Sequence, residues 1–167
     1  MTGNIPFQRI INVLKQSPQA VAGVRGSDAY PTISGCVYFY QMDSGVLVAA
    51  QVTGLPNAAS GSPHRVFGFH IHSGPRCSGT EADPFADVMT HYNPEGSSHP
   101  NHAGDMPPLF GNHGHAFQLF ITDRFSVCEI IHKTVIIHSG PDDFTSQPAG
   151  SAGEKIACGQ IEEFSRC

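Results

Sequence analysis

The chain of 167 residues has no tryptophan and no cysteine pair with the spacing of a zinc knuckle. Five cysteines are present, but none of them forms a Cys-x-x-Cys motif, so a zinc site built from thiolates is not expected. An odd number of cysteines also rules out complete disulfide pairing within one chain. The sequence therefore argues against a thiolate zinc knuckle and excludes a fully disulfide-bonded framework within one chain.

Long apolar runs are missing as well. A membrane-spanning helix needs roughly 18 or more consecutive apolar residues, and no run in the sequence approaches that length. Residues 1–17 lack a basic beginning, and Gln8, Arg9, Asn12 and Lys15 interrupt their apolar residues. This is not the pattern of a secretory signal peptide. We expect no membrane association and a cytoplasmic protein, or a secreted or periplasmic one if a signal was removed.

Positive charge is scarce. The chain has 9 Lys and Arg against 14 Asp and Glu, which gives a net charge of −5. A general nucleic-acid surface requires clustered Lys and Arg, so nucleic acid is not an expected partner. Charged residues make up only 14% of the chain, whereas 18 Gly and 13 Pro are present. This composition is typical of an all-β domain with long ordered loops.

Short segments rich in β-branched and aromatic residues predict the strands of that domain. They lie at residues 20–25, 32–41, 45–52, 65–72, 115–122, 133–138 and 155–161. Seven or eight such strands favour an antiparallel sandwich or barrel. Two long segments between them, 73–112 and 139–154, have little periodicity and are expected to be functional loops. One domain is expected at residues 19–167.

Residues 1–18 are expected to form an N-terminal extension. Phe7, Ile10, Ile11 and Leu14 recur at helical spacing, which predicts a short amphipathic helix. We expect this helix to pack on the domain or on a partner subunit.

Histidines carry the functional signal. The chain has 10, and all but His64 lie between His70 and His138. Neutral histidine is the commonest metal ligand, and imidazole suits zinc and copper. His70 and His72 are two residues apart on a predicted strand, so both side chains point to the same side. With His138 at the end of another predicted strand, they are candidates to grip one metal.

A second set lies on a Gly- and Pro-rich loop that is free to wrap around an ion. Its members are His91, His99, His102 and Asp105. Three imidazoles and a carboxylate make a closed tetrahedral site, the arrangement expected for structural zinc. Four other histidines are expected to be surface or packing residues: His64, His113, His115 and His132.

Several motifs, in this order, resemble the copper/zinc superoxide dismutase family. They are Gly-Phe-His-Ile-His, His-Tyr-Asn-Pro, His-Ala-Gly-Asp, Gly-Asn-His-Gly-His, Val-Ile-Ile-His-x-x-x-Asp-Asp and Gly-Ser-Ala-Gly-Glu-Lys-Ile-Ala-Cys-Gly. The resemblance covers residues 20–161, and the loop pattern is more similar to a bacterial member than to an animal one. It implies a Greek-key β-sandwich or flattened barrel that converts superoxide to oxygen and hydrogen peroxide.

The resemblance assigns the metals. Copper would be bound by His70, His72, His91 and His138. Zinc would be bound by His91, His99, His102 and Asp105. His91 would thus bridge both metals, and it would act in catalysis by carrying a proton to the product. Because the family is usually dimeric, a homodimer is a possible assembly.

The same resemblance assigns residues around the metals. Asp142, four residues after His138, matches the carboxylate that links a copper ligand, His70, to a zinc ligand, His99. An outer carboxylate of this kind fixes the tautomer and orientation of each imidazole.

Two cysteines match the family's disulfide within the subunit, Cys77 and Cys158. Lys155, three residues before Cys158, stands where the family usually has an arginine that steers the anion. Lysine is a flexible point charge without the planar fork of arginine. We therefore expect Lys155 to be catalytic but less effective than arginine.

Other residues add smaller expectations. Acidic residues near the site are Glu81, Asp83 and Asp87. Free thiols are expected at Cys36, Cys128 and Cys167, the first two of them buried.

Two alternative functions stay open. One is a non-enzymatic copper- and zinc-binding protein, a store or chaperone-like domain on the same scaffold. The intact ligand set, Asp142 and a cation at position 155 oppose it. The other is a zinc hydrolase or hydratase, which needs an open position on zinc. The second histidine set fills all four positions.

Overall fold

A computed structural model describes residues 6–62 and 65–164 of the chain. His64 and Cys167, for which a packing role and a free thiol are predicted, lie outside the described residues. Neither α-helix in the described part has the length and apolar character that crossing a membrane requires.

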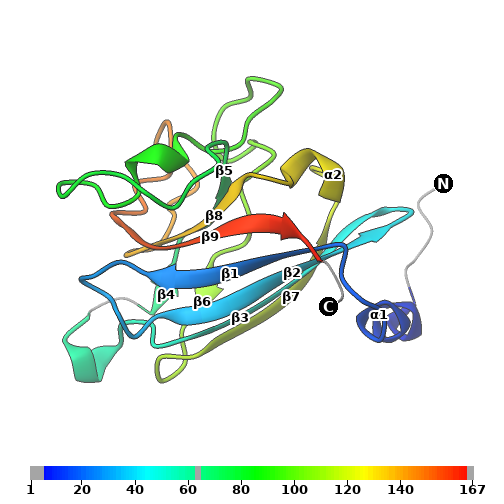
Figure 1. The fold of residues 1–167 in the computed structure, drawn as a ribbon, viewed down its shortest axis with the longest axis horizontal. Coiled ribbons are helices and arrows are strands. Elements are labelled where there is room, and N and C mark those ends of the chain that lie inside the picture. Colours follow the sequence, from blue (N-terminus) through cyan, green and yellow to red (C-terminus); the bar gives the residue numbers. More distant parts are fainter. Residues whose placement is uncertain (1–5, 63–64, 165–167) are drawn as a thin grey trace.

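One antiparallel sheet of seven strands dominates the fold and curls around the core (Figure 1). In spatial order its strands are β5 (Phe69–His72), β8 (Thr134–His138), β9 (Lys155–Glu163), β1 (Ala20–Gly26), β2 (Ser34–Met42), β3 (Gly45–Thr53) and β7 (Ala116–Thr122). A second, two-stranded sheet pairs β4 (Val66–Phe67) with β6 (Leu109–Phe110). Neighbours that are distant in sequence, such as β3 with β7 and β1 with β9, require crossover connections. The predicted antiparallel all-β fold is confirmed.

Alternation along β5 separates the core from the functional face. Phe69 and Ile71 are fully buried in the main apolar cluster. Because successive strand residues point to opposite faces, His70 and His72 are turned away from that cluster. Burying an aromatic or isoleucine side chain stabilises a fold by about 1.5–3 kcal/mol. The core thus fixes the side of the strand on which the two histidines lie.

The predicted strand at residues 65–72 is divided at Gly68. The backbone N–H of Gly68 donates to Gly140, and its carbonyl accepts from the N–H of His138. A Cβ atom at this position would lie 2.7 Å from the Cβ of Ala152. Glycine therefore lets the second long loop approach the strand closely, and the pairing changes partner at this point.

The predicted N-terminal helix is α1 (Phe7–Leu14), which packs beside the sheet (Figure 1). Ile10 and Val13 contact an apolar cluster on β2 and β3. The predicted apolar stripe is only partly correct, because Phe7 is 72% exposed and Leu14 is 38% exposed. The contact is short and uses the middle of the helix, so both ends stay in solvent. The division of the chain at residue 18 stays a prediction.

A short helix, α2 (Val127–Ile130), lies where no helix is predicted. Glu129 accepts hydrogen bonds from the backbone N–H of Ser126 at 2.7 Å and from its hydroxyl at 2.6 Å. The Ser-x-x-Glu spacing is that of a capping box, and it could have predicted the start of this helix from the sequence. The predicted burial of Cys128 is wrong, because this residue lies on the exposed side of α2. Cys36 is half-buried, and both residues are free thiols.

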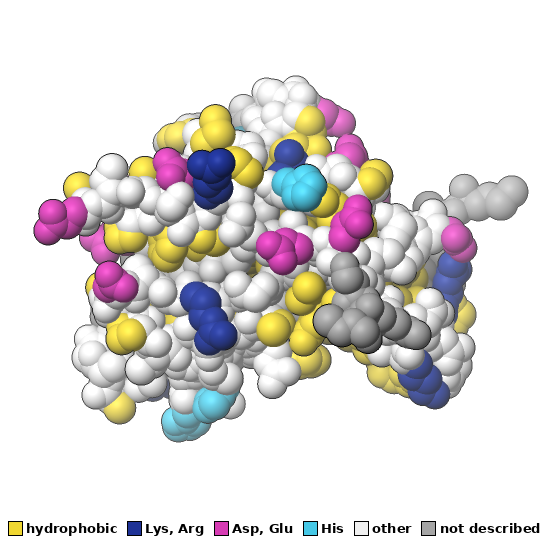
Figure 2. All heavy atoms as spheres, in the orientation of Figure 1, with side chains coloured by type: hydrophobic (Ala, Val, Ile, Leu, Met, Phe, Trp, Pro, Cys, Tyr) yellow, Lys and Arg dark blue, Asp and Glu magenta, His cyan; other side chains and the backbone are white. Residues whose placement is uncertain are grey.

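The two long loops gather on the same side of the sheet, next to β5 and β8 (Figure 1). The first contains the short helix η2 (Ala86–Val88), and η1 (Ala58–Ser60) lies in a separate connection. On the face drawn in Figure 2, Lys and Arg side chains are scattered singly among Asp and Glu side chains. This face therefore presents no gathered basic patch.

Candidate metal centre

Two neighbouring strands and one loop bring four histidines together. His70 and His72 lie on β5, and His138 ends the hydrogen-bonded neighbour β8. The ring centroid of His138 is 4.9 Å from that of His70 and 5.7 Å from that of His72. His91 reaches the same place from the first long loop, with its ring centroid 4.0 Å from that of His70. We call His70, His72, His91 and His138 the strand group.

The strand group has lone pairs without partners. Four of its buried ring nitrogens have no hydrogen-bond partner among the described residues: His70 Nδ1, His72 Nε2, His91 Nε2 and His138 Nε2. The opposite nitrogens are occupied, since His72 Nδ1 donates to Met89 O at 2.9 Å and His138 Nδ1 to Gly153 O at 3.2 Å. A buried polar atom left unpaired costs free energy. Candidate ligand atoms within 4.8 Å of one another fit a shared metal ion.

A second group converges on one carboxylate. His91 Nδ1 is 2.7 Å from Asp105 Oδ1, while His99 Nδ1 and His102 Nδ1 lie 3.1 and 3.4 Å from Asp105 Oδ2. All four residues are buried, and one ligand atom from each lies within 4.8 Å of the others. We call His91, His99, His102 and Asp105 the loop group. Its donors fill the four positions of a tetrahedral ion.

Two residues join the groups. His91 belongs to both, because its Nδ1 faces Asp105 while its Nε2 faces the strand group. Asp142 is the other link: one carboxylate oxygen accepts from His70 Nε2 at 2.8 Å and the other from His99 Nε2 at 2.9 Å. Each imidazole therefore has one nitrogen held by Asp142, which leaves its Nδ1 as the acceptor.

Gly150 and Gln147, which the sequence did not point to, support this link. Gly150 has a φ of +69°, and a Cβ there would lie 1.9 Å from Asp142 Oδ1, so only glycine fits. The side-chain N–H of Gln147 donates to the carbonyl of His99 at 2.8 Å, and its oxygen accepts from the N–H of His99 at 3.1 Å. The second long loop thus holds the first in place.

Arg124, between β7 and α2, holds the same loop from the other side. Its Nη1 donates to the carbonyl of Pro100 at 2.9 Å and to those of His102 and Asp105 at 3.3 Å. These contacts join residues that are distant in sequence, and no sequence motif predicts them. Arg124 therefore positions the backbone that carries the loop group.

Burial lowers the pKa of three histidines in the strand group. It lowers the pKa of His70, lowers that of His72 well below its ordinary value, and with nearby His70 lowers the pKa of His138 to about 3. Burial opposes charge on Asp105 and Asp142 too, but hydrogen bonds from the imidazoles outweigh it and lower the pKa of both carboxyls. Metal ligands must be deprotonated, and each of these shifts favours the deprotonated form.

A cleft of about 810 Å³ opens over the strand group, and His72, His91 and His138 lie in its wall. Lys155 starts β9 opposite His138 and also lines this cleft. Its ammonium is not free, because Lys155 Nζ lies 2.5 Å from Asp83 Oδ2. Glu81 lines the cleft as well, whereas Asp87 is not among its lining residues. Two of the three acidic residues predicted near the site, Glu81 and Asp83, thus line the cleft, but the ion pair of Lys155 was not predicted.

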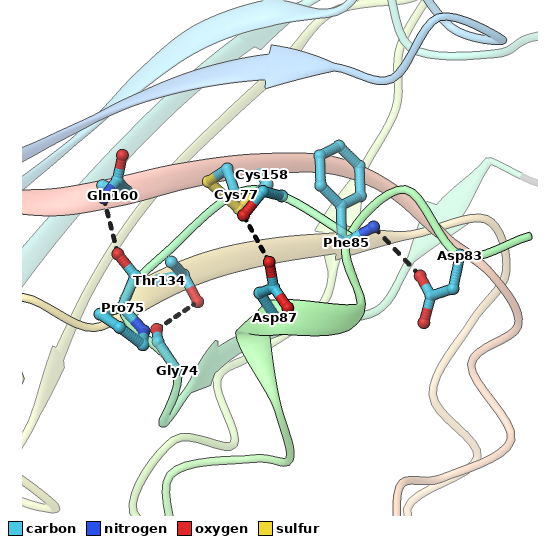
Figure 3. The surroundings of a disulfide bond; sticks show 10 residues. Gly74, Pro75, Cys77, Asp83, Phe85, Asp87, Thr134, Cys158 and Gln160 are labelled. Carbon is cyan, nitrogen blue, oxygen red and sulfur yellow. Dashed lines mark hydrogen bonds between the residues drawn. A yellow bond between two sulfur atoms is a disulfide. The ribbon is translucent and has the colours of Figure 1, made fainter. Parts of the chain in front are cut away.

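The structure contains the predicted disulfide between Cys77, in the first long loop, and Cys158, in β9. Figure 3 shows Asp83 close by, where its carboxylate accepts from the backbone N–H of Phe85 at 3.1 Å. The Phe85 side chain packs with both cysteines in a small apolar cluster. The disulfide therefore ties the loop that carries Asp83 to the strand that begins at Lys155.

A sequence profile described as copper/zinc superoxide dismutase matches residues 33–161, well over half of the chain. The chain belongs to the copper/zinc superoxide dismutase family. A relative, superoxide dismutase [Cu-Zn] from Schizosaccharomyces pombe, is 35% identical over 161 residues, covering 86% of this chain and 96% of its own length. Superoxide dismutase [Cu-Zn] 2 from Aquifex aeolicus is 33% identical over 144 residues, covering 77% and 79%.

A solved structure of Cu/Zn superoxide dismutase from Brucella abortus matches with a TM-score of 0.71 at 23% identity, covering 86% of this chain and 99% of that one. At this identity the match supports the fold. Membership of the superoxide dismutase family implies copper and zinc, and the donors present fit both. The strand group offers four unpartnered imidazole nitrogens, and the loop group offers three imidazoles and a carboxylate. Of the remaining described histidines, His113, His115 and His132 belong to neither group.

Proposed function

We propose that the chain dismutes superoxide with copper held by the strand group and zinc held by the loop group. The observation that supports this assignment best is that His91 belongs to both groups. Its Nδ1 contacts Asp105 of the loop group, and its Nε2 is left for the strand group. The family to which the chain belongs supports superoxide as the substrate. The closed loop group suits a structural metal, since it leaves no position for water.

Copper, when bound, supplies the one-electron chemistry by which one superoxide is oxidised to oxygen and a second is reduced to hydrogen peroxide. The protein supplies the rest. Asp142 fixes the His70 ring, so that Nδ1 keeps its lone pair. Carbonyl groups do the same for His72 and His138. His91 lines the cleft, and its Nε2 has no partner among the described residues, so this nitrogen would take up the proton that forming peroxide requires and pass it on.

Lys155 is the proposed anion-attracting residue. It lines the cleft beside His91 and His138, so its charge acts where an anion enters. A cation in a cleft raises the local concentration of an anionic substrate and its rate of association. Replacing Lys155 with arginine should raise kcat/KM for superoxide, because the planar guanidinium binds with more than one donor. An unchanged or lower rate would contradict this role.

Metal analysis with single substitutions tests the assignment. His138→Ala should lose copper and keep zinc, because His138 belongs to the strand group alone. His102→Ala should do the reverse. Metal content after dialysis reports on each site without reference to activity, and a dismutation assay is run on the same samples. Copper-loaded protein that fails to dismute superoxide would favour the storage alternative, and zinc in both sites with no copper uptake would favour a hydrolase.

We also propose a homodimer and a cytoplasmic location. Large apolar side chains that stay exposed support a second copy as partner, among them Phe117, 74% exposed on the edge strand β7. Light scattering on the purified protein tests the dimer, and a single-chain mass at micromolar concentration would contradict it. Cell fractionation tests the location, and protein recovered from the periplasm or the medium would contradict it.

A further inference from the structure

We propose that Asp83 restrains Lys155 and thereby sets how strongly the cleft attracts superoxide. The inference rests on the proposed role of Lys155 as the anion-attracting residue. An anion that approaches the strand group has to compete with the Asp83 carboxylate for the same ammonium. Asp83 is thus a positioning residue, acting on substrate through Lys155.

The ion pair lies partly inside the cleft. Lys155 Nζ and Asp83 Oδ2 are 2.5 Å apart, with the two side chains 18% and 43% exposed. Exposed ion pairs are weak because water and salt screen them. Lys155 is shielded on most sides, so its pairing with Asp83 is screened less than that of an ordinary surface pair. The Asp83 carboxylate therefore occupies the ammonium group that an entering anion would contact.

Asp83 is held in place by its own loop. One carboxylate oxygen, Oδ1, accepts from the N–H of Phe85 at 3.1 Å, which leaves Oδ2 for Lys155. The backbone carbonyl of Asp83 accepts from the N–H of Thr80 at 2.8 Å and from that of Ala86 at 3.1 Å. Figure 3 shows Asp83 on the same loop as Phe85, whose side chain packs with the two cysteines. The orientation of the carboxylate is thus built into the loop.

The charges around the cleft give the pair its consequence. Among the described residues that line the cleft, Glu81, Asp83 and Glu154 are acidic, and Lys155 is the single Lys or Arg. Once Asp83 pairs with this cation, the remaining carboxylates make the entrance net negative. Like charge lowers the local concentration of an anion. Lys155 is paired in the described cleft, so it attracts an entering anion less strongly than an unpaired Lys155 would.

Asp83→Asn separates the pair with little change to the loop, because the amide oxygen still accepts from the N–H of Phe85. Glu81→Gln is the matched control: it removes the same charge from the same cleft, but Glu81 has no ion pair with a described residue. Pulse radiolysis gives kcat/KM for superoxide at several salt concentrations. Azide, an anion of the same charge, gives a dissociation constant from the absorption of the copper-loaded protein.

We expect Asp83→Asn to raise kcat/KM about three- to tenfold at low salt and to tighten azide binding by a similar factor. Glu81→Gln should change both by less than about twofold. The rate of Asp83→Asn should fall steeply with added salt, because an unpaired cation then steers the anion. Equal effects of the two substitutions on both measurements would overturn the inference.

A Lys155→Gln background completes the test. There Asp83→Asn should have no larger effect than Glu81→Gln, since no cation remains to be released. If Lys155→Gln alone changes neither rate nor azide affinity, the proposed role of Lys155 fails and the inference with it, whereas dismutation by the unaltered protein tests the function separately.

Circular dichroism and thiol titration check the fold and disulfide. Should Asp83→Asn not fold, Asp83→Ser, whose hydroxyl also accepts from Phe85, replaces it.

Discussion

The two halves of the metal centre are built by different means. Three of the four histidines of the strand group lie on β5 and β8, whose antiparallel hydrogen bonds place them before any metal binds. The loop group lies within residues 91–105, where regular secondary structure is almost absent. Its geometry depends on side chains from elsewhere, namely Arg124, Asp142 and Gln147. A sheet presents ligands through its backbone, whereas a loop needs distant residues to hold it.

The comparison predicts different behaviour without metal. The strand group should stay close to its ligand geometry, because the surrounding core residues of β5 and β8 are fully buried. The loop group should gain order from zinc, since metal binding supplies free energy that an apolar core supplies elsewhere. This difference in order between the two groups can be tested by several measurements, beginning with the largest expected effect.

Acidification of the metal-free protein should act on the strand group. Burial lowers the pKa of His70 and His72, and that of His138 to about 3, while histidine in an unfolded chain titrates near 6.5. Below that pH the histidines of the unfolded chain bind protons, whereas the buried imidazoles of the folded chain stay neutral. The free energy of unfolding therefore falls as the pH falls. Each such group contributes up to about 1.4 kcal/mol per pH unit. Several kcal/mol should be lost between pH 7 and pH 5.

Urea unfolding of the metal-free protein across that range measures the loss. His138→Gln, which cannot take up a proton, should flatten the profile by the share of one histidine. Asp105 and Asp142 have lowered pKa values, so they contribute stability above the ordinary carboxyl range and lose it only in stronger acid. A flat profile between pH 7 and pH 5 would contradict neutral, buried imidazoles in the strand group.

Asp142→Asn should disturb both halves, because an amide offers one oxygen where the carboxylate serves two imidazoles. Loss of an outer hydrogen-bond partner typically lowers metal affinity about 10- to 100-fold. Competition with a chromophoric chelator measures the zinc affinity. Asp143→Asn is the control, since among the described residues that exposed neighbour accepts hydrogen bonds only from Thr145 and Ser146 in its own turn. Equal losses in both variants would indicate a general effect on the loop.

Hydrogen exchange should separate the halves directly. In metal-free protein we expect amides of residues 91–105 to exchange about tenfold or more faster than those of β5 and β8, because local opening requires less buried apolar area there. Added zinc should slow the loop and leave the strands nearly unchanged. Equal protection of both regions without metal would mean that the side-chain contacts alone order the loop.

Arg124→Gln should give the smallest effect. The lost hydrogen bonds involve a charged donor, but they lie at an exposed side chain, so a cost of about 1 kcal/mol is expected. Zinc affinity should fall about fivefold, with copper affinity unchanged. Arg124→Lys, which keeps the charge, should recover part of the loss. A larger effect on copper than on zinc would contradict the assignment of Arg124 to the loop group.

Local signals in the sequence predicted the parts of the centre that lie on strands. Alternation around Gly68 to His72 gave the face of β5, and the apolar run before His138 gave β8. The family resemblance added the pairing of Asp142 with His70 and His99, which spacing alone leaves open. Each of these rests on a pattern within a few residues or on a shared motif.

Such local signals could not predict contacts between side chains that are far apart in the sequence. Arg124 meets the carbonyl of Pro100 across two elements, and Lys155 meets Asp83 across 72 residues of chain. Which partners meet is decided by the folded path of two loops that lack periodicity. The short helix α2 is a different failure, because the Ser126 and Glu129 spacing was readable. Its neglect led to the wrong burial of Cys128.

The shared carboxylate of Asp142 and the shared ring of His91 have a thermodynamic consequence. Two ions held by the strand group and the loop group would share His91, and their ligands His70 and His99 share Asp142, so filling one site would change the free energy of filling the other. By reciprocity, whatever factor zinc imposes on copper affinity, copper imposes on zinc affinity. The two sites would therefore form a single linked equilibrium, in which the supply of one metal also changes the occupancy of the other.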